Sequence, residues 1–151
     1  MRRGKDVPLV RLKIVKEGAV RLPPSMSTLT ADGAAYLARQ RIGGMDREAF
    51  LVIALDSHRR PTSMTVAAIG GLTRAYVAPS EVYSIALAAR AASIVVVHNH
   101  PSGDATPTRE DLSVTRRLAE AGRLLGIPLM DHIILGEGQA YTSLRQKGVI
   151  R

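Results

Sequence analysis

The most constraining feature of this chain is a block of β-branched residues at 94–97 that runs directly into the segment His-Asn-His-Pro-Ser-Gly at 98–103. Such a block, ended by proline and glycine, is typical of a buried strand. Because side chains alternate along a strand, His98 and His100 project from the same face. The sequence therefore predicts two imidazoles that point to one place at the end of a buried strand.

A carboxylate follows these histidines at short range. Residues 101–107 turn the chain, and Thr108 opens a predicted helix whose first turn carries Asp111. Two imidazoles and one carboxylate are three of the four ligands that a catalytic zinc uses, and the fourth position is left for water. His98, His100 and Asp111 are therefore the candidate metal ligands.

Simpler interpretations of the same residues stay open. A lone pair of histidines is more often a core or surface feature than a metal site. Thr108 and Asp111 have the spacing of a capping box, a role that is compatible with metal binding. Asp104 lies in a Gly-Asp turn, where loop hydrogen bonding is the expected role. A nuclease class also named for His-Asn-His disperses those residues across a hairpin and a helix, which the adjacent letters here do not reproduce.

The motif as a whole resembles a known family. His98-x-His100, seven residues, Thr108, two residues and Asp111 is similar to the signature of the JAMM (MPN-plus) metalloproteases, which usually has serine where this chain has Thr108. Three segments resemble the JAB domain of bacterial RadC proteins: His-Asn-His-Pro-Ser-Gly-Asp (98–104), Thr-Pro-Thr-Arg-Glu-Asp (106–111) and Asp-His-Ile-Ile-Leu-Gly (131–136). The similarity covers about residues 28–144, which is most of the chain.

The resemblance implies a zinc metallopeptidase or isopeptidase whose peptide substrate is unidentified. The resemblance also implies a general base upstream of the histidines, and Glu48, at the start of an apolar segment, is the candidate. In this mechanism zinc lowers the pKa of water, Glu48 accepts the proton and the Thr108 hydroxyl donates to the oxyanion. A solvated residue at a strand edge is the ordinary alternative for Glu48. His58, in a polar turn, and His132, in an apolar strand, are expected to be structural.

The order of elements predicts an α/β fold. We expect helices at about 30–41, 79–92 and 108–125, and strands at 49–55, 62–69, 93–98, 129–135 and 140–144. A mixed sheet with helices packed on it satisfies this order. It agrees with the three-layer JAB/MPN (cytidine deaminase-like) fold that the resemblance implies. Residues 26–151 would form this domain, preceded by a basic extension at 1–25 with an edge strand around 7–15.

Composition limits the location and the partners. No run reaches the roughly 18 apolar residues that a membrane span needs, and the first residues lack the apolar core of a signal peptide. The chain has no cysteine, which excludes thiolate ligands and fits a cytoplasmic protein. It has one Phe, four Tyr and no Trp, which argues against platforms for base stacking.

The net charge of +8 is concentrated at the start of the chain. Residues 1–21 hold seven Lys and Arg against Asp6 and Glu17. Such an arm either makes the protein soluble or binds nucleic acid through phosphate contacts.

Two alternatives to a hydrolase remain: a nucleic-acid-binding protein of DNA repair or mobile elements, and a non-catalytic MPN scaffold. RadC proteins usually carry a helix-hairpin-helix region before this domain, and the residues before 28 are too few for one.

Overall fold

The computed structural model describes residues 4–70 and 77–151. Its elements, in chain order, are η1 (Pro24–Met26), α1 (Ala31–Ile42), β1 (Ala49–Leu55), β2 (Pro61–Ile69), α2 (Pro79–Ala88), β3 (Ser93–Asn99), α3 (Arg109–Leu125), β4 (Leu129–Leu135) and β5 (Tyr141–Ser143). This is the mixed α/β arrangement that the sequence predicts.

The strands form one mixed sheet in the order β2-β1-β3-β4-β5. β1 pairs antiparallel with both β2 and β3, β3 pairs parallel with β4, and β4 pairs antiparallel with β5. All seven residues of the central strand β3 are buried. This explains why its sequence is a continuous apolar block, since a strand that is covered on both faces has no polar side.

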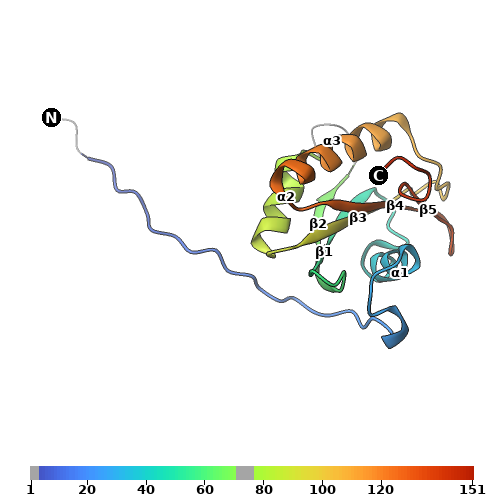
Figure 1. Ribbon diagram of the computed structural model, residues 1–151, viewed down its shortest axis with the longest axis horizontal. Helices are drawn as coiled ribbons and strands as arrows, with labels where there is room; N and C mark the ends of the chain where they lie inside the picture. Colours follow the sequence, from blue (N-terminus) through green and yellow to red (C-terminus); the bar gives the residue numbers. More distant parts are fainter. Residues whose placement is uncertain (1–3, 71–76) are drawn as a thin grey trace.

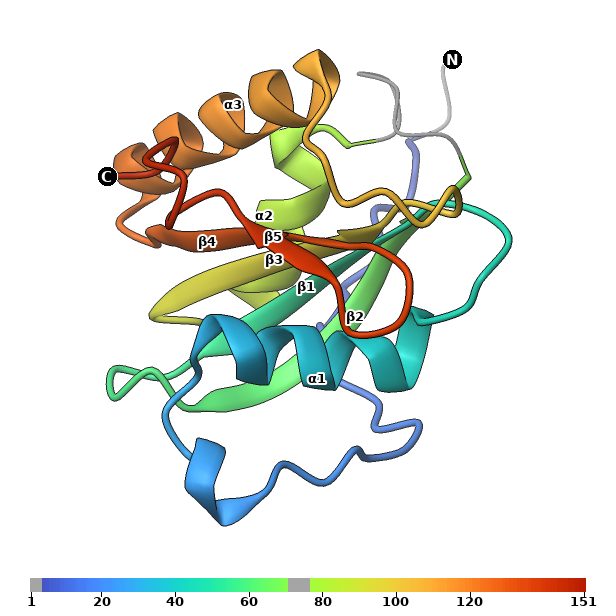
Figure 2. The same ribbon diagram turned by 90° about the vertical axis from the view of Figure 1, so that its right-hand side faces the viewer.

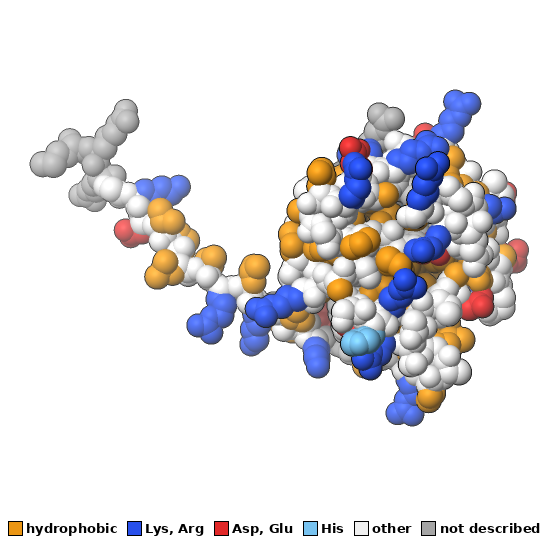
Figure 3. All heavy atoms as spheres, viewed as in Figure 1, with side chains coloured by type: hydrophobic (Ala, Val, Ile, Leu, Met, Phe, Trp, Pro, Cys, Tyr) orange, Lys and Arg blue, Asp and Glu red, His pale blue; other side chains and the backbone are white. Residues whose placement is uncertain are grey.

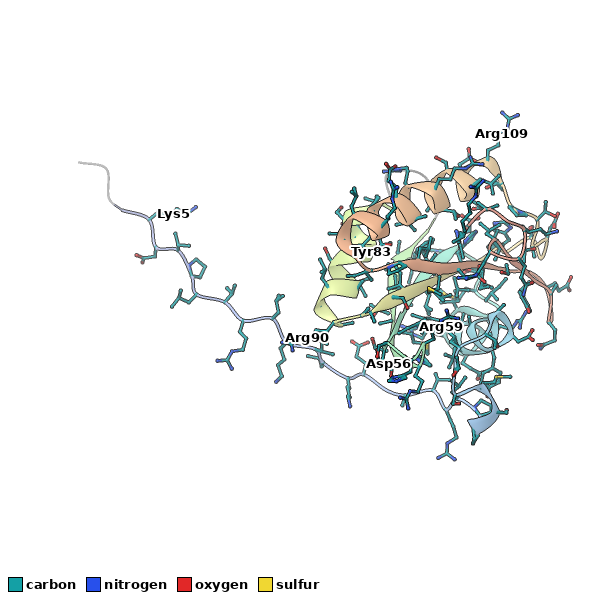
Figure 4. The ribbon with its side chains drawn as sticks, in the orientation of Figure 1. Lys5, Asp56, Arg59, Tyr83, Arg90 and Arg109 are labelled. Carbon is teal, nitrogen blue, oxygen red and sulfur yellow. The ribbon has the colours of Figure 1, made fainter. Side chains whose placement is uncertain are left out.

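Helices cover both faces of the sheet, so the fold has three layers (Figure 2). On one face α2 and α3 pack on the sheet around a core that includes Val96 and Leu118. On the other face α1 packs on the sheet around a core that includes Val97 and Ala38. Tyr83 of α2 donates a hydrogen bond to the Leu118 carbonyl at 2.9 Å and so connects the two helices of one layer (Figure 4).

The helix ends follow local sequence rules with one exception. Thr30 caps α1 by accepting a hydrogen bond from the Gly33 N–H at 3.1 Å. Gly126 ends α3 in the left-handed conformation, with φ of 71°. The sequence predicts α2 to about residue 92, but the helix stops at Ala88, because Arg90 takes a positive φ of 51° and turns the chain toward β3.

The N-terminal extension is a correction to the sequence prediction. The described residues 4–22 contain no helix or strand, so the edge strand expected around 7–15 is absent. Residues 4–19 are exposed, and Leu9, Val10 and Leu12 are each more than four-fifths exposed. The segment extends away from the domain (Figure 1). Its alternating pattern does not produce a strand because no sheet edge supplies the ladder hydrogen bonds or covers the apolar side chains.

Charge and apolar side chains alternate along the exposed extension (Figure 3). Lys5 lies on it far from the domain (Figure 4). Within the residues that the structure describes, none of the helices has the length and the hydropathy needed to span a membrane.

Candidate metal centre

The alternation of β3 sorts the predicted site residues between the two faces of the sheet. His98 lies on the same face as Val96, toward α3, and His100 follows it two residues later. Asn99 points to the other face, toward the segment that leaves α1. In the register of the sheet, His98 lies opposite Phe50 of β1, and Val96 lies beside His132 of β4.

The structure brings the three candidate ligands together. His98 Nε2 lies 3.0 Å from His100 Nε2 and 3.1 Å from Asp111 Oδ1, and His100 Nε2 lies 3.2 Å from Asp111 Oδ2. The side chains of His98 and Asp111 are 0% and 3% exposed, and that of His100 is 9% exposed. Among the described residues, these three form a group whose candidate ligand atoms all lie within 4.8 Å of one another.

This donor set fits a zinc ion. Bonds of about 2.0–2.2 Å in tetrahedral geometry separate the ligand atoms of zinc by about 3.3 Å. The observed separations of 3.0–3.2 Å are close to that value. Two nitrogens and one carboxylate oxygen leave one tetrahedral position for another ligand, which is the composition of catalytic zinc sites.

The orientation of His100 is set by the loop that follows it. Its Nδ1 lies 2.7 Å from the backbone carbonyl oxygen of Asp104. A carbonyl oxygen only accepts, so Nδ1 is the donor and the Nε2 of neutral His100 carries a lone pair. The Asp104 carboxylate accepts hydrogen bonds from the N–H and the hydroxyl of Thr106 at 2.9 and 2.7 Å. The loop role expected for Asp104 is thereby confirmed.

Asp111 is held by the start of α3. The Thr108 N–H donates to Asp111 Oδ2 at 2.8 Å, and the Asp111 N–H donates to Thr108 Oγ1 at 3.2 Å. The capping box predicted from the sequence is therefore present. Burial raises the pKa of Asp111, but its interaction with His98 and the hydrogen bonds from Thr108 lower it more, so that this pKa lies well below its ordinary value. Asp111 is therefore an ionised carboxylate, the form that binds a metal ion.

Glu48 lies immediately before β1 and is half-buried. The β1–β3 register ends with the pair Phe50 and His98, and Glu48 and His100 each lie two residues beyond this pair. The Glu48 carbonyl accepts a hydrogen bond from the Gly70 N–H at 2.7 Å, which fixes its backbone. Among the described residues, Glu48 is not a member of the group of candidate ligands.

Asn99 fixes the segment that carries Glu48, a role that the sequence analysis missed. Its Oδ1 accepts from the Ala49 N–H at 2.7 Å, and its Nδ2 donates to the Arg47 carbonyl at 2.9 Å. The signal for this role was the alternation itself, because a polar residue between His98 and His100 must point to the opposite face.

His132 is a second residue whose role the sequence analysis did not identify. It was expected to be a structural, hydrogen-bonded imidazole, and it is fully buried and hydrogen-bonded. Its partner, however, is the candidate ligand His98, at 2.7 Å between His132 Nε2 and His98 Nδ1. Burial, and after it the charge of His98, holds the pKa of His132 well below its usual value. His58 is the turn residue that was expected, with its N–H bonded to the Asp56 carboxylate at 2.8 Å.

A cleft of about 550 Å³ opens beside His100. His100 and Asn99 line it together with Arg39 and the segments 43–46, 101–103 and 135–138. Five glycines lie in these segments, so backbone forms much of the wall. An extended chain in this cleft would pass next to His100.

Comparisons with known proteins agree with the motif and the fold. A family model described as RadC-like JAB domain matches residues 28–149. The UPF0758 protein of Desulforamulus reducens is 43% identical over 114 residues, which are 76% of this chain and 50% of that protein. The UPF0758 protein of Rubrobacter xylanophilus is 42% identical over 128 residues, 85% of this chain and 54% of that protein. This chain thus spans about half the length of the curated relatives it matches.

Proposed function

Because this chain belongs to the RadC-like JAB domain family and brings His98, His100 and Asp111 together, we propose that it is a zinc-dependent hydrolase of amide bonds, a metallopeptidase or isopeptidase. One observation carries this proposal. The two imidazole Nε2 atoms lie 3.0 Å apart, and each lies 3.1–3.2 Å from one oxygen of the Asp111 carboxylate, beside an open cleft. Lone pairs at such distances repel one another unless a cation or a proton lies between them, and zinc is the cation that this donor set suits.

In the proposed mechanism, zinc held by these three residues would supply the Lewis acidity that lowers the pKa of water from about 15.7 toward 7. Glu48 accepts a proton from the attacking water and passes it to the leaving amine. The Thr108 hydroxyl donates a hydrogen bond to the oxygen that develops negative charge. Its oxygen accepts from the Asp111 N–H, so the hydroxyl proton is available for this bond.

The position of Glu48 supports its assignment as the base. Glu48 and His100 each lie two residues beyond the last β1–β3 pair, at the same end of the two antiparallel strands, and Asn99 and Gly70 hold the backbone around Glu48. A general base must reach the water without binding the metal tightly, and Glu48 is outside the group of candidate ligands among the described residues. The amide substrate class comes from the family resemblance. The cleft beside His100 is compatible with an extended chain.

Metal analysis of the purified protein tests the site. We expect about one zinc per chain, and we expect His98→Ala with His100→Ala to remove it, because a single remaining carboxylate is a weak ligand set. A circular dichroism spectrum checks that the double variant is folded, and His58→Ala serves as the control, since His58 lies in an exposed turn. Stoichiometric zinc in the double variant would disprove the site.

A second candidate function follows from the exposed extension. Its described part carries Lys5, Arg11, Lys13, Lys16 and Arg21, all exposed. Flexible basic segments bind nucleic acid through phosphate contacts. We therefore propose nucleic acid as a further partner, through residues 1–21. A non-catalytic scaffold is the less favoured alternative, because His98, His100 and Asp111 are all present and adjacent.

A further inference from the structure

A chain of buried hydrogen bonds connects helix α3 to His98 through strand β4. The Thr115 hydroxyl lies 2.6 Å from the Asp111 carbonyl oxygen and 2.6 Å from His132 Nδ1. His132 Nε2 lies 2.7 Å from His98 Nδ1. Thr115, His132 and His98 are each 0% exposed, so water does not substitute for any of these bonds.

The direction of each bond follows from counting protons. The Asp111 carbonyl can only accept, so it takes the single hydroxyl proton of Thr115. The Thr115 oxygen must therefore accept from His132, which puts a proton on His132 Nδ1. A neutral His132 then has a lone pair on Nε2, and that nitrogen accepts from His98 Nδ1. When His98 is neutral, its Nε2 then carries a lone pair that is directed at His100 and Asp111.

The alternative is a doubly protonated His132 that donates to His98. It would place a full positive charge on a ring that is completely buried. The two polar neighbours of its nitrogens are Thr115 and His98, and neither is a carboxylate. A buried charge without such a partner is costly, so the neutral ring is favoured.

Packing holds the rings in this arrangement. The Phe50 ring stacks on His98 with a centroid separation of 6.1 Å and an interplanar angle of 13°. The same ring meets His132 edge-on at 5.6 Å. Because the rings cannot turn freely in a filled core, the hydrogen bonds and the ring planes support one another.

We propose that Thr115 and His132 are positioning residues that keep a proton on His98 Nδ1 and so present His98 Nε2 to the cation. This inference rests on the proposed metal site, since the presented nitrogen is one of its ligands. Residues that hold the outer nitrogen of a ligand histidine fix its tautomer and its orientation, and their loss typically weakens metal binding about 10–100-fold. Thr115 also donates its hydroxyl proton to the Asp111 carbonyl oxygen. The same series of buried hydrogen bonds therefore contacts two of the three candidate ligands, His98 and Asp111.

Nitrogen NMR of the imidazole rings tests the proton positions in the unmutated protein. We would record it at a pH about two units above the ordinary histidine pKa of about 6.5, with and without added zinc. The expected result is a proton on Nδ1 of both His98 and His132, and none on His132 Nε2. A proton on His132 Nε2, or none on His98 Nδ1, would overturn the inference.

Zinc affinity, measured by competition with a chelator, tests the effect. Thr115→Val keeps the shape but removes the hydroxyl, and we expect zinc binding to weaken about 10–100-fold. Thr115→Ser restores the hydroxyl and should return the affinity to near that of the unmutated protein. Tyr83→Phe is the matched control, because it also removes a buried hydroxyl that donates to a carbonyl of α3, away from the histidines. Equal zinc affinities for Thr115→Val and Tyr83→Phe would contradict the positioning role.

These results separate the inference from the proposed function. If the protein binds no zinc but its imidazole protons lie as described, the metal assignment fails and the proton arrangement stands. If zinc binds and His132 carries its proton on Nε2, the metal site stands and the positioning role fails. If Thr115→Val does not fold, the NMR of the unmutated protein still decides.

Discussion

The candidate metal centre and the N-terminal extension carry the strongest sequence signals, but the first is buried in the fold and the second is exposed to solvent. The histidines lie between packed layers, where β1, β3, β4 and α3 each contribute a contact. The extension at 4–19 is exposed along its whole length. Polar residues acquire a defined geometry in the first region because every neighbouring group is fixed, whereas charges in the second interact mainly with water.

The difference extends to the consequences of mutation. In the buried region, a lost hydrogen bond leaves a partner without compensation, and unfolding free energy or metal affinity falls. In the extension, a substitution removes no packed contact. The following predictions compare the two regions, beginning with the largest expected effect.

The largest effect is expected from the proposed base. Glu48→Gln keeps the size of the side chain but cannot accept the proton, so zinc should be retained while hydrolysis falls about 10²–10⁴-fold. Asp111→Asn should lose both, because a neutral amide is a poor zinc ligand. Zinc content and cleavage of a peptide and isopeptide library, read by mass spectrometry, are the measurements. Cleavage by Glu48→Gln at the unmutated rate would rule out Glu48 as the base.

Asn99→Ala should lower the free energy of unfolding by removing hydrogen bonds on the face of β3 opposite to His98. The buried Ala49 N–H loses its acceptor, at a cost of about 1–3 kcal/mol in unfolding free energy, and the Arg47 carbonyl loses a donor as well. Zinc should be retained, since His98 projects from the other face. Asn99→Asp keeps the acceptor for Ala49 and should lose less stability. Urea denaturation and metal analysis measure both quantities, and loss of zinc in Asn99→Ala would show that the two faces are coupled.

Substitutions at two glycines, Gly122 in the folded domain and Gly18 in the extension, test how tightly each region is packed. A methyl group on Gly122 of α3 would meet the Tyr83 hydroxyl and the Ile127 carbonyl oxygen, whereas one on Gly18 would have no atom within 4 Å. We expect Gly122→Ala to lower the free energy of unfolding by about 1–3 kcal/mol. Gly18→Ala should change it by less than about 0.5 kcal/mol. Similar urea midpoints for both variants would mean that α3 is less tightly packed than the structure describes.

The smallest effect on the fold is expected from truncation. Deletion of residues 1–19 stops before Val20, which packs against the α1 side of the core. Unfolding free energy and zinc content should therefore remain within error. If the extension binds nucleic acid, the deletion should abolish a gel shift whose affinity falls steeply with salt, because phosphate contacts release counterions. An unchanged gel shift after truncation would exclude the extension as the binding segment.

Much of the fold was predictable because its signals are local. The strands β1 and β4 lie at the residues expected from their apolar blocks, and Thr108 caps α3 as predicted. The end of α2 and the expected strand at 7–15 were wrong. Both depend on tertiary contacts: a turn residue with positive φ in one case and the absence of a pairing edge in the other.

The candidate site was also predictable only where its signals are local in the sequence. Alternation along β3 predicts that His98 and His100 share a face, and the capping spacing predicts that Asp111 begins α3. Neither pattern indicates that His132, which is 34 residues from His98 in sequence, lies against it. That contact arises from the parallel pairing of β3 and β4, which no local pattern encodes.

The sequence by itself determined most of the elements, the family resemblance and the three candidate ligands, because each of these follows from residue types at fixed short spacings. The tertiary structure alone decided which polar groups support those ligands and which charges remain in solvent. The hydrogen bonds of Thr115, His132 and Asn99 join strands and helices that are distant in the chain. Their geometry exists only once the sheet is assembled and both of its faces are covered.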